Sequence, residues 1–190
     1  MEFTAAAVLP EIIVIDPDVH RDERGHFLEV FRKQRYAKHG IINDFVQDNL
    51  SYSTKGVLRG LHYQLGKPQG KLVWVVHGEV FDVAIDIRRG SPTFGKWVGM
   101  ILSSTQCRQI FIPQGFAHGF CVVSEYATML YKCTEYYAPN EEHGIRWDDP
   151  TLAIDWPPMN PIVSKKDRQY PSLKDIPENE LPLFAETLSD

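Results

Sequence analysis

The sequence predicts an all-β fold, a sandwich or barrel built from many short strands. Over much of the chain, apolar and polar residues alternate with a period of two, which is the pattern of strands with one buried face. Glycine and proline residues separate these segments at fairly regular intervals, as turns do in sandwiches and barrels. Helical patterns are few. We expect one short helix near residues 32–40 and another after Ser164.

The clearest alternation lies in residues 80–88, where one face is apolar and the other carries two aspartates. The apolar segment 71–76 precedes it and is joined to it through His77-Gly78. Residues 71–88 are therefore predicted to form one long hairpin. The other predicted strands are residues 11–15, 25–31, 57–64, 97–102, 108–113, 119–123 and 127–137.

Length and composition indicate one domain over residues 1–190. A chain of 190 residues is long enough to bury a substantial core, and 43% hydrophobic with 24% charged residues is typical of globular proteins. The segment from about residue 156 is rich in proline. We expect it to wrap around the barrel rather than to form a second domain.

Charge and cysteine content exclude several classes of protein. The net charge of −5 argues against a nucleic-acid-binding surface, although a few convergent cations can still bind a small anion. Cys107, Cys121 and Cys133 are odd in number and form no short metal-binding pair, which favours reduced thiols in the cytoplasm. The sequence shows neither a signal-peptide pattern nor an apolar run of membrane-spanning length. We expect a cytoplasmic protein with no nucleic-acid or membrane partner.

The segment IPQGFAHGF, residues 112–120, matches the second half of the cupin jelly-roll pattern, in which a turn delivers a histidine into the barrel. Metal-binding cupins supply His-x-His and a glutamate from an earlier strand. At that place this chain has a single His62, followed by Tyr63 and Gln64. The sequence therefore predicts no metal site. His118 is left with two interpretations, a hydrogen-bonded core histidine or a ligand contact.

The strand LRGLHYQ combines Arg59 and His62 with apolar neighbours. Strict alternation places these two side chains on opposite faces of the strand. They can reach one pocket only if Gly60 kinks or bulges the strand, which glycine often does. The concentration of polar groups here favours a functional site.

Two further residues have both a structural and a chemical interpretation. Tyr131 lies in a strand-like segment and is suited to a barrel wall. With an ordinary pKa of about 10, it could act as an acid only toward a strong base such as an enolate. Asp167 follows Ser164 at the spacing of a helix start. Alternatively, it is the carboxylate that orients a histidine.

Taken together, these segments resemble the dTDP-4-dehydrorhamnose 3,5-epimerase family, and the matches run in order from about residue 10 to residue 170. The family is a cupin-type jelly roll that works as a homodimer without metal or redox cofactor. Its substrate is dTDP-4-keto-6-deoxyglucose, in the pathway to dTDP-rhamnose. The matching segments are residues 22–29, 47–49, 56–64, 69–88, 91–99, 112–120, 130–142 and 164–167.

The resemblance implies a role for each matched residue. His62 would be the base at sugar carbons 3 and 5, with Asp167 as its partner, and Tyr131 the acid on the opposite face of the ring. Lys71 and Arg59 would serve the developing oxyanion and the pyrophosphate. The ring of Tyr137, together with Phe27, would stack on thymine, and the strand from Arg24 to Glu29 would come from the neighbouring subunit. The residues implied to hold nucleotide and sugar are Arg24, Glu29, Gln47, Asn49, His118, Tyr137, Glu142 and Lys166.

The residue types suit this chemistry. A proton beside a ketone becomes removable when a preorganised cation stabilises the enolate, and histidine is matched to the role of base at neutral pH. No glycine-rich dinucleotide loop is present, and epimerisation needs none. Asp82 remains an alternative partner for His62. The rival functions are a single-carbon epimerase, a 3,4-ketoisomerase, a metal-dependent cupin oxygenase, whose ligands are lacking, and a non-catalytic sugar-binding jelly roll.

Overall fold

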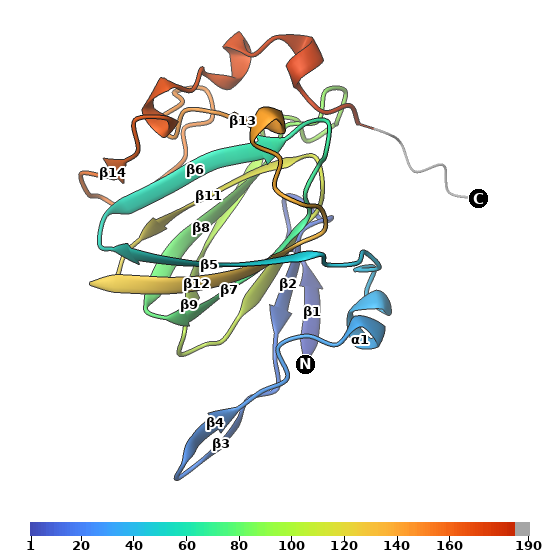
Figure 1. The fold of residues 1–190 in the computed structure, drawn as a ribbon, viewed down its shortest axis with the longest axis vertical. Coiled ribbons are helices and arrows are strands. Elements are labelled where there is room, and N and C mark those ends of the chain that lie inside the picture. The colour runs from blue at the N-terminus through green and yellow to red at the C-terminus, as the bar shows by residue number, and fades with distance from the viewer. Residues whose placement is uncertain (185–190) are drawn as a thin grey trace.

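The computed structural model describes residues 1–184 and contains two large sheets and a small hairpin (Figure 1). The first sheet has the order β1 (Glu2–Ala5), β2 (Ile13–Asp16), β10 (Gln109–Ile112), β7 (Lys71–His77), β12 (Tyr126–Cys133) and β5 (Gln47–Thr54). The second has the order β13 (Glu142–Gly144), β6 (Val57–Gln64), β11 (Phe116–Val122), β8 (Glu79–Asp86) and β9 (Trp97–Ser103), and β14 (Ile162–Val163) pairs with β6. The predicted all-β jelly roll is confirmed.

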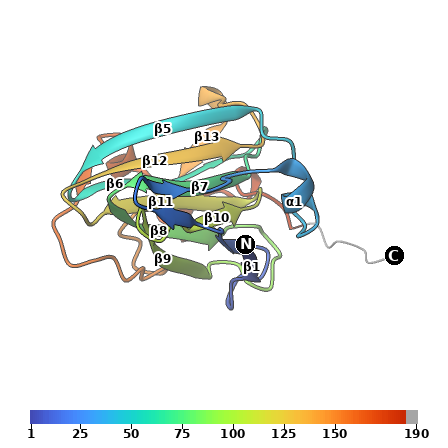
Figure 2. The ribbon, with the colours of Figure 1, turned by 90° about the horizontal axis from the view of Figure 1, so that it is seen from below.

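The main core lies between the two sheets. Val73 and Val75 of β7 meet Ala84 of β8 and Phe116 and Phe120 of β11 in one buried cluster. Burying these apolar side chains together removes them from water, and this drives the two sheets together. Strand β5 is one edge of the first sheet and β9 is one edge of the second, and these two edges lie on opposite sides of the molecule (Figure 2).

A second apolar cluster covers the outer face of the second sheet. Val83 and Ile85 of β8 pack against Leu152, Leu173 and Ile176 from the C-terminal part of the chain. That part runs over the sheet through three short 3₁₀ helices (Figure 1). The apolar face of β8 therefore points outward, and the face that carries the aspartates points inward. The three helices are η2 (Asp167–Gln169), η3 (Leu173–Asp175) and η4 (Glu178–Glu180).

The predicted hairpin over residues 71–88 is wrong, because β7 and β8 belong to different sheets. Gly78 is the one residue between them and has a φ of +77°. A Cβ there would stand 2.1 Å from the backbone oxygen of Tyr126. The chain turns a corner at this glycine and crosses from one sheet to the other, a turn that alternation within each strand cannot reveal.

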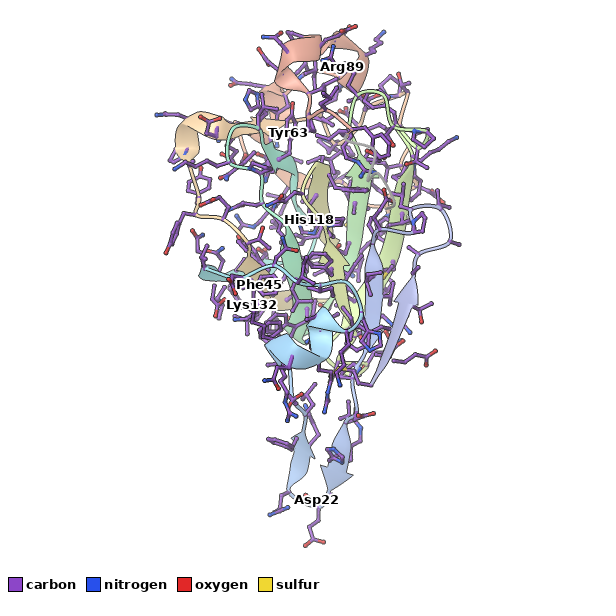
Figure 3. The ribbon with its side chains drawn as sticks, turned by 90° about the vertical axis from the view of Figure 1, so that its right-hand side faces the viewer. Asp22, Phe45, Tyr63, Arg89, His118 and Lys132 are labelled. Atoms are coloured by element: carbon purple, nitrogen blue, oxygen red, sulfur yellow. The ribbon has the colours of Figure 1, made fainter. Side chains whose placement is uncertain are left out.

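The predicted strand over residues 25–31 is shorter than expected. Only β4 (Gly25–Phe27) is extended, and it pairs with β3 (His20–Asp22) in a hairpin that projects from the body of the molecule (Figures 1 and 3). The expected helix near 32–40 is α1 (Lys33–Ala37), and the strand predicted to reach residue 137 ends at Cys133. One further 3₁₀ turn, η1 (Pro139–Glu141), precedes β13. Within residues 1–184 no helix has the length and hydrophobicity that a membrane crossing requires.

The end of β8 supplies a test of fold stability. Asp86 is fully buried and accepts hydrogen bonds from Arg88 at 2.7 Å, from the hydroxyl of Ser91 and from that of Thr93 at 2.7 Å. Arg88 also bonds Glu11 at 2.8 Å. Asp86→Ala leaves the largely buried Arg88 with Glu11 as its remaining carboxylate partner and takes the acceptor from Ser91 and Thr93. Because breaking a buried ion pair is costly, the variant should lower the free energy of unfolding by about 3–5 kcal/mol in urea titrations.

A matched control is Asp148→Ala. Asp148 also forms an ion pair, with 2.7 Å between its Oδ1 and the Nε of Arg146, but both side chains are about two-fifths exposed. Exposed ion pairs contribute little to stability, so this variant should unfold like the parent protein. Equal losses in the two variants would contradict the structural role assigned to Asp86.

Candidate active site

A cavity of about 660 Å³ opens between the two sheets, at the side where β5 and β6 lie. A smaller hollow of about 270 Å³ adjoins it. The side chains common to both are His62, Lys71, Tyr131, Tyr137 and Glu142. The structure thus brings residues from several strands of both sheets to one place.

A bulge in β6 places Arg59 and His62 in the same cavity. Gly60 has a φ of +124°, and a Cβ on it would stand 2.6 Å from the Cα of Gly119. At this point the register between β6 and β11 shifts. Both Arg59 and His62 consequently line the cavity, although alternation alone would separate them. The bulge hypothesised at Gly60 is confirmed.

His62 forms a hydrogen bond with Asp167, with 2.9 Å between Nε2 and Oδ1. Asp167 is almost completely buried, and its second oxygen accepts the backbone N–H of Gly60 at 3.3 Å. Its own N–H donates to the hydroxyl of Ser164 at 3.0 Å. The two interpretations of Asp167 are therefore compatible, since it stands at the helix start and also orients a histidine.

The electrostatics of this pair keep Asp167 ionised. Burial raises the pKa of the Asp167 carboxyl, but the hydrogen bond and charge of His62 lower it more, so the pKa lies below its usual value. An ionised carboxylate only accepts, and Nε2 of His62 must then carry the proton. In the neutral imidazole, Nδ1 then has a free lone pair that can accept a proton from a substrate.

A second histidine–carboxylate pair lies beside the first. His118 of β11 stands directly opposite His62 in the strand register, and its Nε2 is 2.9 Å from Oδ2 of Asp82 on β8. Both members are buried, and His118 lines the cavity. Figure 3 shows His118 in the middle of the barrel. Asp82 is thus committed to His118, and the partner of His62 is Asp167.

Two cations lie in the cavity. Lys71 of β7 is half-buried, and burial lowers its pKa, while the nearby Cys133, Asp82 and Glu142 raise it in part. Arg59 donates from Nε to the hydroxyl of Ser53 at 3.1 Å, which fixes its guanidinium at the cavity wall. Both side chains are placed to offset negative charge on a bound molecule.

Tyr131 lies on β12 of the first sheet, opposite the sheet that carries His62, and both line the same cavity. Burial raises the pKa of Tyr131 above its ordinary value, with smaller contributions from Cys133 and Glu142. The phenol consequently keeps its proton at neutral pH. A molecule held between the sheets therefore meets an imidazole on one side and a phenol on the other.

Five polar residues cluster at the mouth of the cavity. The hydroxyl of Tyr137 donates to Glu142 at 2.9 Å, and Lys166 forms an ion pair with the same carboxylate oxygen. Burial raises the pKa of Glu142, but Lys166, Tyr137 and His62 lower it below its usual value. Gln47 accepts the backbone N–H of Tyr137 at 2.8 Å. Gln47 also donates to Asn49 at 3.0 Å, and both line the smaller hollow.

The structure does not bring Arg24, Phe27 or Glu29 to the cavity of their own chain. Arg24 is exposed and pairs with Asp22 at the tip of the β3–β4 hairpin, far from the barrel (Figure 3). Phe27 is 71% exposed. Glu29 forms an ion pair with Arg35 at 3.1 Å.

One residue beside the site was missed by sequence reasoning. The ring of Tyr170 packs edge-on against the His62 imidazole, with ring centroids 5.8 Å apart. Tyr170 lies in the proline-rich tail, where no periodic pattern identifies a buried side chain. No signal in the sequence alone could have found it.

Comparison with known proteins identifies the family. A family model described as dTDP-4-dehydrorhamnose 3,5-epimerase matches residues 6–175. The chain belongs to this family. The family resemblance predicted from the sequence is thereby confirmed.

Individual relatives agree with this assignment. The dTDP-4-dehydrorhamnose 3,5-epimerase of Pseudomonas aeruginosa is 52% identical over 92% of this chain and 97% of its own length. The crystal structure of a dTDP-6-deoxy-D-glucose-3,5-epimerase from Legionella pneumophila, in complex with dTDP-4-keto-L-rhamnose, superposes with a TM-score of 0.94 at 52% identity, over 97% of this chain and 98% of that one. A 3′-monoepimerase from Streptomyces bikiniensis in complex with dTDP-quinovose has a TM-score of 0.88 at 31% identity, over 95% and 92% of the two chains.

Proposed function

We propose that this epimerase inverts carbons 3 and 5 of dTDP-4-keto-6-deoxyglucose to give dTDP-4-keto-rhamnose, a step toward dTDP-rhamnose. The observation that carries the proposal is the placement of the His62–Asp167 pair and Tyr131 on opposite sheets of one cavity. Inversion of a carbon by proton transfer requires removal of a proton from one face and its return to the other.

His62 begins the reaction by removing the proton from the carbon beside the ketone. The electron pair of that C–H bond moves onto the carbonyl oxygen and forms an enolate. The charges of Lys71 and Arg59 stabilise the oxygen as it becomes negative. Asp167 accepts the hydrogen bond from Nε2 and stabilises the imidazolium that forms when Nδ1 takes the proton.

Tyr131 completes the inversion by donating its phenolic proton to the opposite face of the same carbon. Burial raises the pKa of this phenol, so it releases its proton only to a strong base such as the enolate. The resulting phenolate and imidazolium return to their starting states by exchange with water. No electrons are gained or lost overall, and the reaction therefore needs no redox cofactor.

The mouth of the cavity suits the nucleotide part of the substrate. Tyr137 is 48% exposed and offers its ring for stacking on thymine, together with Phe27 of a neighbouring subunit. Arg59 and Lys166 carry the positive charge that a pyrophosphate requires. The remaining polar side chains that we assign to the nucleotide and sugar are Gln47, Asn49, His118 and Glu142, together with Arg24 and Glu29 from the neighbouring subunit.

The structure of the product tests the proposal. Incubation of the enzyme with dTDP-4-keto-6-deoxyglucose should give a sugar inverted at both carbons, as shown by its proton coupling constants in NMR. A single-carbon epimerase, such as the Streptomyces relative, would invert one carbon, and a 3,4-ketoisomerase would move the carbonyl. Either product would contradict the proposed function. A non-catalytic sugar-binding protein would leave the substrate unchanged.

The enzyme should remain fully active after dialysis against a chelator. Where a metal-binding cupin has ligands, Tyr63 donates to the backbone of Glu180 at 3.0 Å, and Gln64 donates to the backbone of Lys67 at 2.7 Å. Among residues 1–184, no three His, Cys, Asp or Glu side chains are grouped so as to hold a metal ion. Elemental analysis should find no stoichiometric transition metal, and a bound metal whose removal abolishes turnover would contradict this account.

We further propose a homodimer in which the β3–β4 hairpin completes the site of the partner subunit. The hairpin projects from its own chain (Figure 1), and the exposed Phe27 is the last residue of β4. Arg24→Ala and His62→Asn, each nearly inactive alone, should regain activity when mixed after mild unfolding and refolding, because a mixed dimer contains one intact site. Up to about a quarter of parent activity is expected for random pairing. If mass spectrometry shows that mixed dimers have formed but no activity returns, the proposal that the hairpin completes the partner's site is wrong.

The setting that suits this protein is the cytoplasm. Its three cysteines are free and buried, as expected where thiols stay reduced. The proposed partners are the nucleotide sugar and a second copy of the chain, and neither a nucleic acid nor a membrane is required.

A further inference from the structure

A slot beside His62 is filled by an aromatic ring. Tyr170 meets the imidazole edge-to-face, with the ring planes at 71° and the centroids 5.8 Å apart. The slot exists because Gly144 of β13, the residue paired with His62 in the sheet, has no side chain. A Cβ at Gly144 would stand 2.3 Å from the Tyr170 ring. The ring therefore lies over the backbone beside His62.

The chain holds this ring in place from both sides. Just before it, η2 is fixed by the bond between the N–H of Asp167 and Ser164. Just after it, the carbonyl of Pro171 accepts the N–H of Arg146 at 2.9 Å, and the N–H of Leu173 donates to Asp149 at 2.6 Å. Tyr170 is thus part of a well-anchored segment.

The hydroxyl of Tyr170 takes no part in these contacts. Its oxygen is buried and has no hydrogen-bond partner within residues 1–184. Burial raises the pKa of Tyr170 to about 12, with Glu142 adding to the effect and Lys166 opposing it, so the phenol keeps its proton at neutral pH. The ring, and not the hydroxyl, makes the contact with His62.

We propose that Tyr170 is a positioning residue for His62. Its ring restricts the imidazole to the orientation in which Nε2 bonds Asp167 and Nδ1 stays available, and it shields that bond from water. This inference rests on the proposed role of His62 as the base. The effect on the catalytic rate should be large, because a small misplacement of a reacting group can reduce a rate by about 10²-fold.

Two substitutions separate the ring from the hydroxyl. Tyr170→Ala removes the ring, and we expect kcat to fall by at least about 10-fold with KM nearly unchanged. Tyr170→Phe keeps the ring and should restore kcat to within about 2-fold of the parent enzyme. Thermal unfolding and dTDP affinity are measured for both variants, which establishes that each is folded and binds nucleotide.

A second readout does not depend on catalysis. The Nε2 proton of His62, held by Asp167, should give a downfield proton resonance that persists in water in the parent and in Tyr170→Phe. In Tyr170→Ala it should broaden through exchange with solvent. If the parent enzyme and its variants are all inactive on the proposed substrate, this resonance still tests the positioning role.

Three results would overturn the proposal. A Tyr170→Ala enzyme with parental kcat and a persistent resonance would show that the ring does not position His62. Equal loss in Tyr170→Phe and Tyr170→Ala would transfer the role to the hydroxyl. A change confined to KM or to thermal stability would assign Tyr170 to binding or to folding.

Discussion

Replacement of His62 by asparagine should stop the entry of deuterium at both carbons of the substrate in deuterated water. Asparagine retains a similar shape and a polar side chain but cannot accept the proton. Because a positioned base typically contributes about 10²–10⁴-fold, the exchange rate at carbon 3 and at carbon 5 should fall by that factor together. Proton NMR of the sugar signals, followed over time, measures both positions in one experiment.

The control for this variant is nucleotide binding. His62 lies in the inner part of the cavity, whereas Tyr137 and Lys166 lie at its mouth, so the affinity for dTDP should change little. His118→Asn is a matched substitution in the neighbouring pair. We expect this variant to weaken substrate binding and to leave the exchange rate at saturating substrate unchanged. The reason is that His118 bonds Asp82 and takes no part in the His62–Asp167 pair. Parental exchange rates in His62→Asn would contradict the mechanism.

Replacement of Tyr131 by phenylalanine should separate exchange from inversion. His62 can still remove a proton and return a deuteron to the same face, at least at carbon 5. The expected product is therefore labelled starting sugar, with formation of the inverted sugar reduced by about 10²–10⁴-fold. Phenylalanine preserves the packing of Tyr131 against the core, and no hydrogen bond of its hydroxyl within residues 1–184 is lost.

The label pattern distinguishes this result from a general loss of activity. If Tyr131→Phe slowed exchange and inversion equally, the phenol would be needed for proton removal, and the assigned division of roles would be wrong. If inversion continued at the parental rate, another acid would have to reach the opposite face.

The fold was predictable where the strands are strongly patterned. Residues 57–64 were predicted with their observed bounds, because apolar side chains and turn signals mark them. Strand β5 was missed, since its sequence QDNLSYST is mostly polar and lies at the edge of a sheet. The expected hairpin failed at Gly78, because one glycine serves equally in a tight turn and in a corner between sheets. Which strands pair with one another is decided by the whole fold and not by the local sequence.

The site was predictable where reactive polar side chains are concentrated in a short sequence motif. The bulge at Gly60 followed from the need for Arg59 and His62 to share a pocket, and the structure has it. The choice between Asp82 and Asp167 could not be made, because both are compatible with the strand pattern and only the course of the tail decides it. The contact of Tyr170 depends on that same tail and on the register of β13.

The most direct test of the central claim is the deuterium content of the sugar made by the parent enzyme in deuterated water. The claim is that protons, and not hydrides, are exchanged at both carbons beside the ketone. The account predicts a product inverted at carbons 3 and 5 that carries one deuterium at each, seen as a mass increase of about two units and as the loss of both proton signals. Retention of the original hydrogen at either inverted carbon would contradict it.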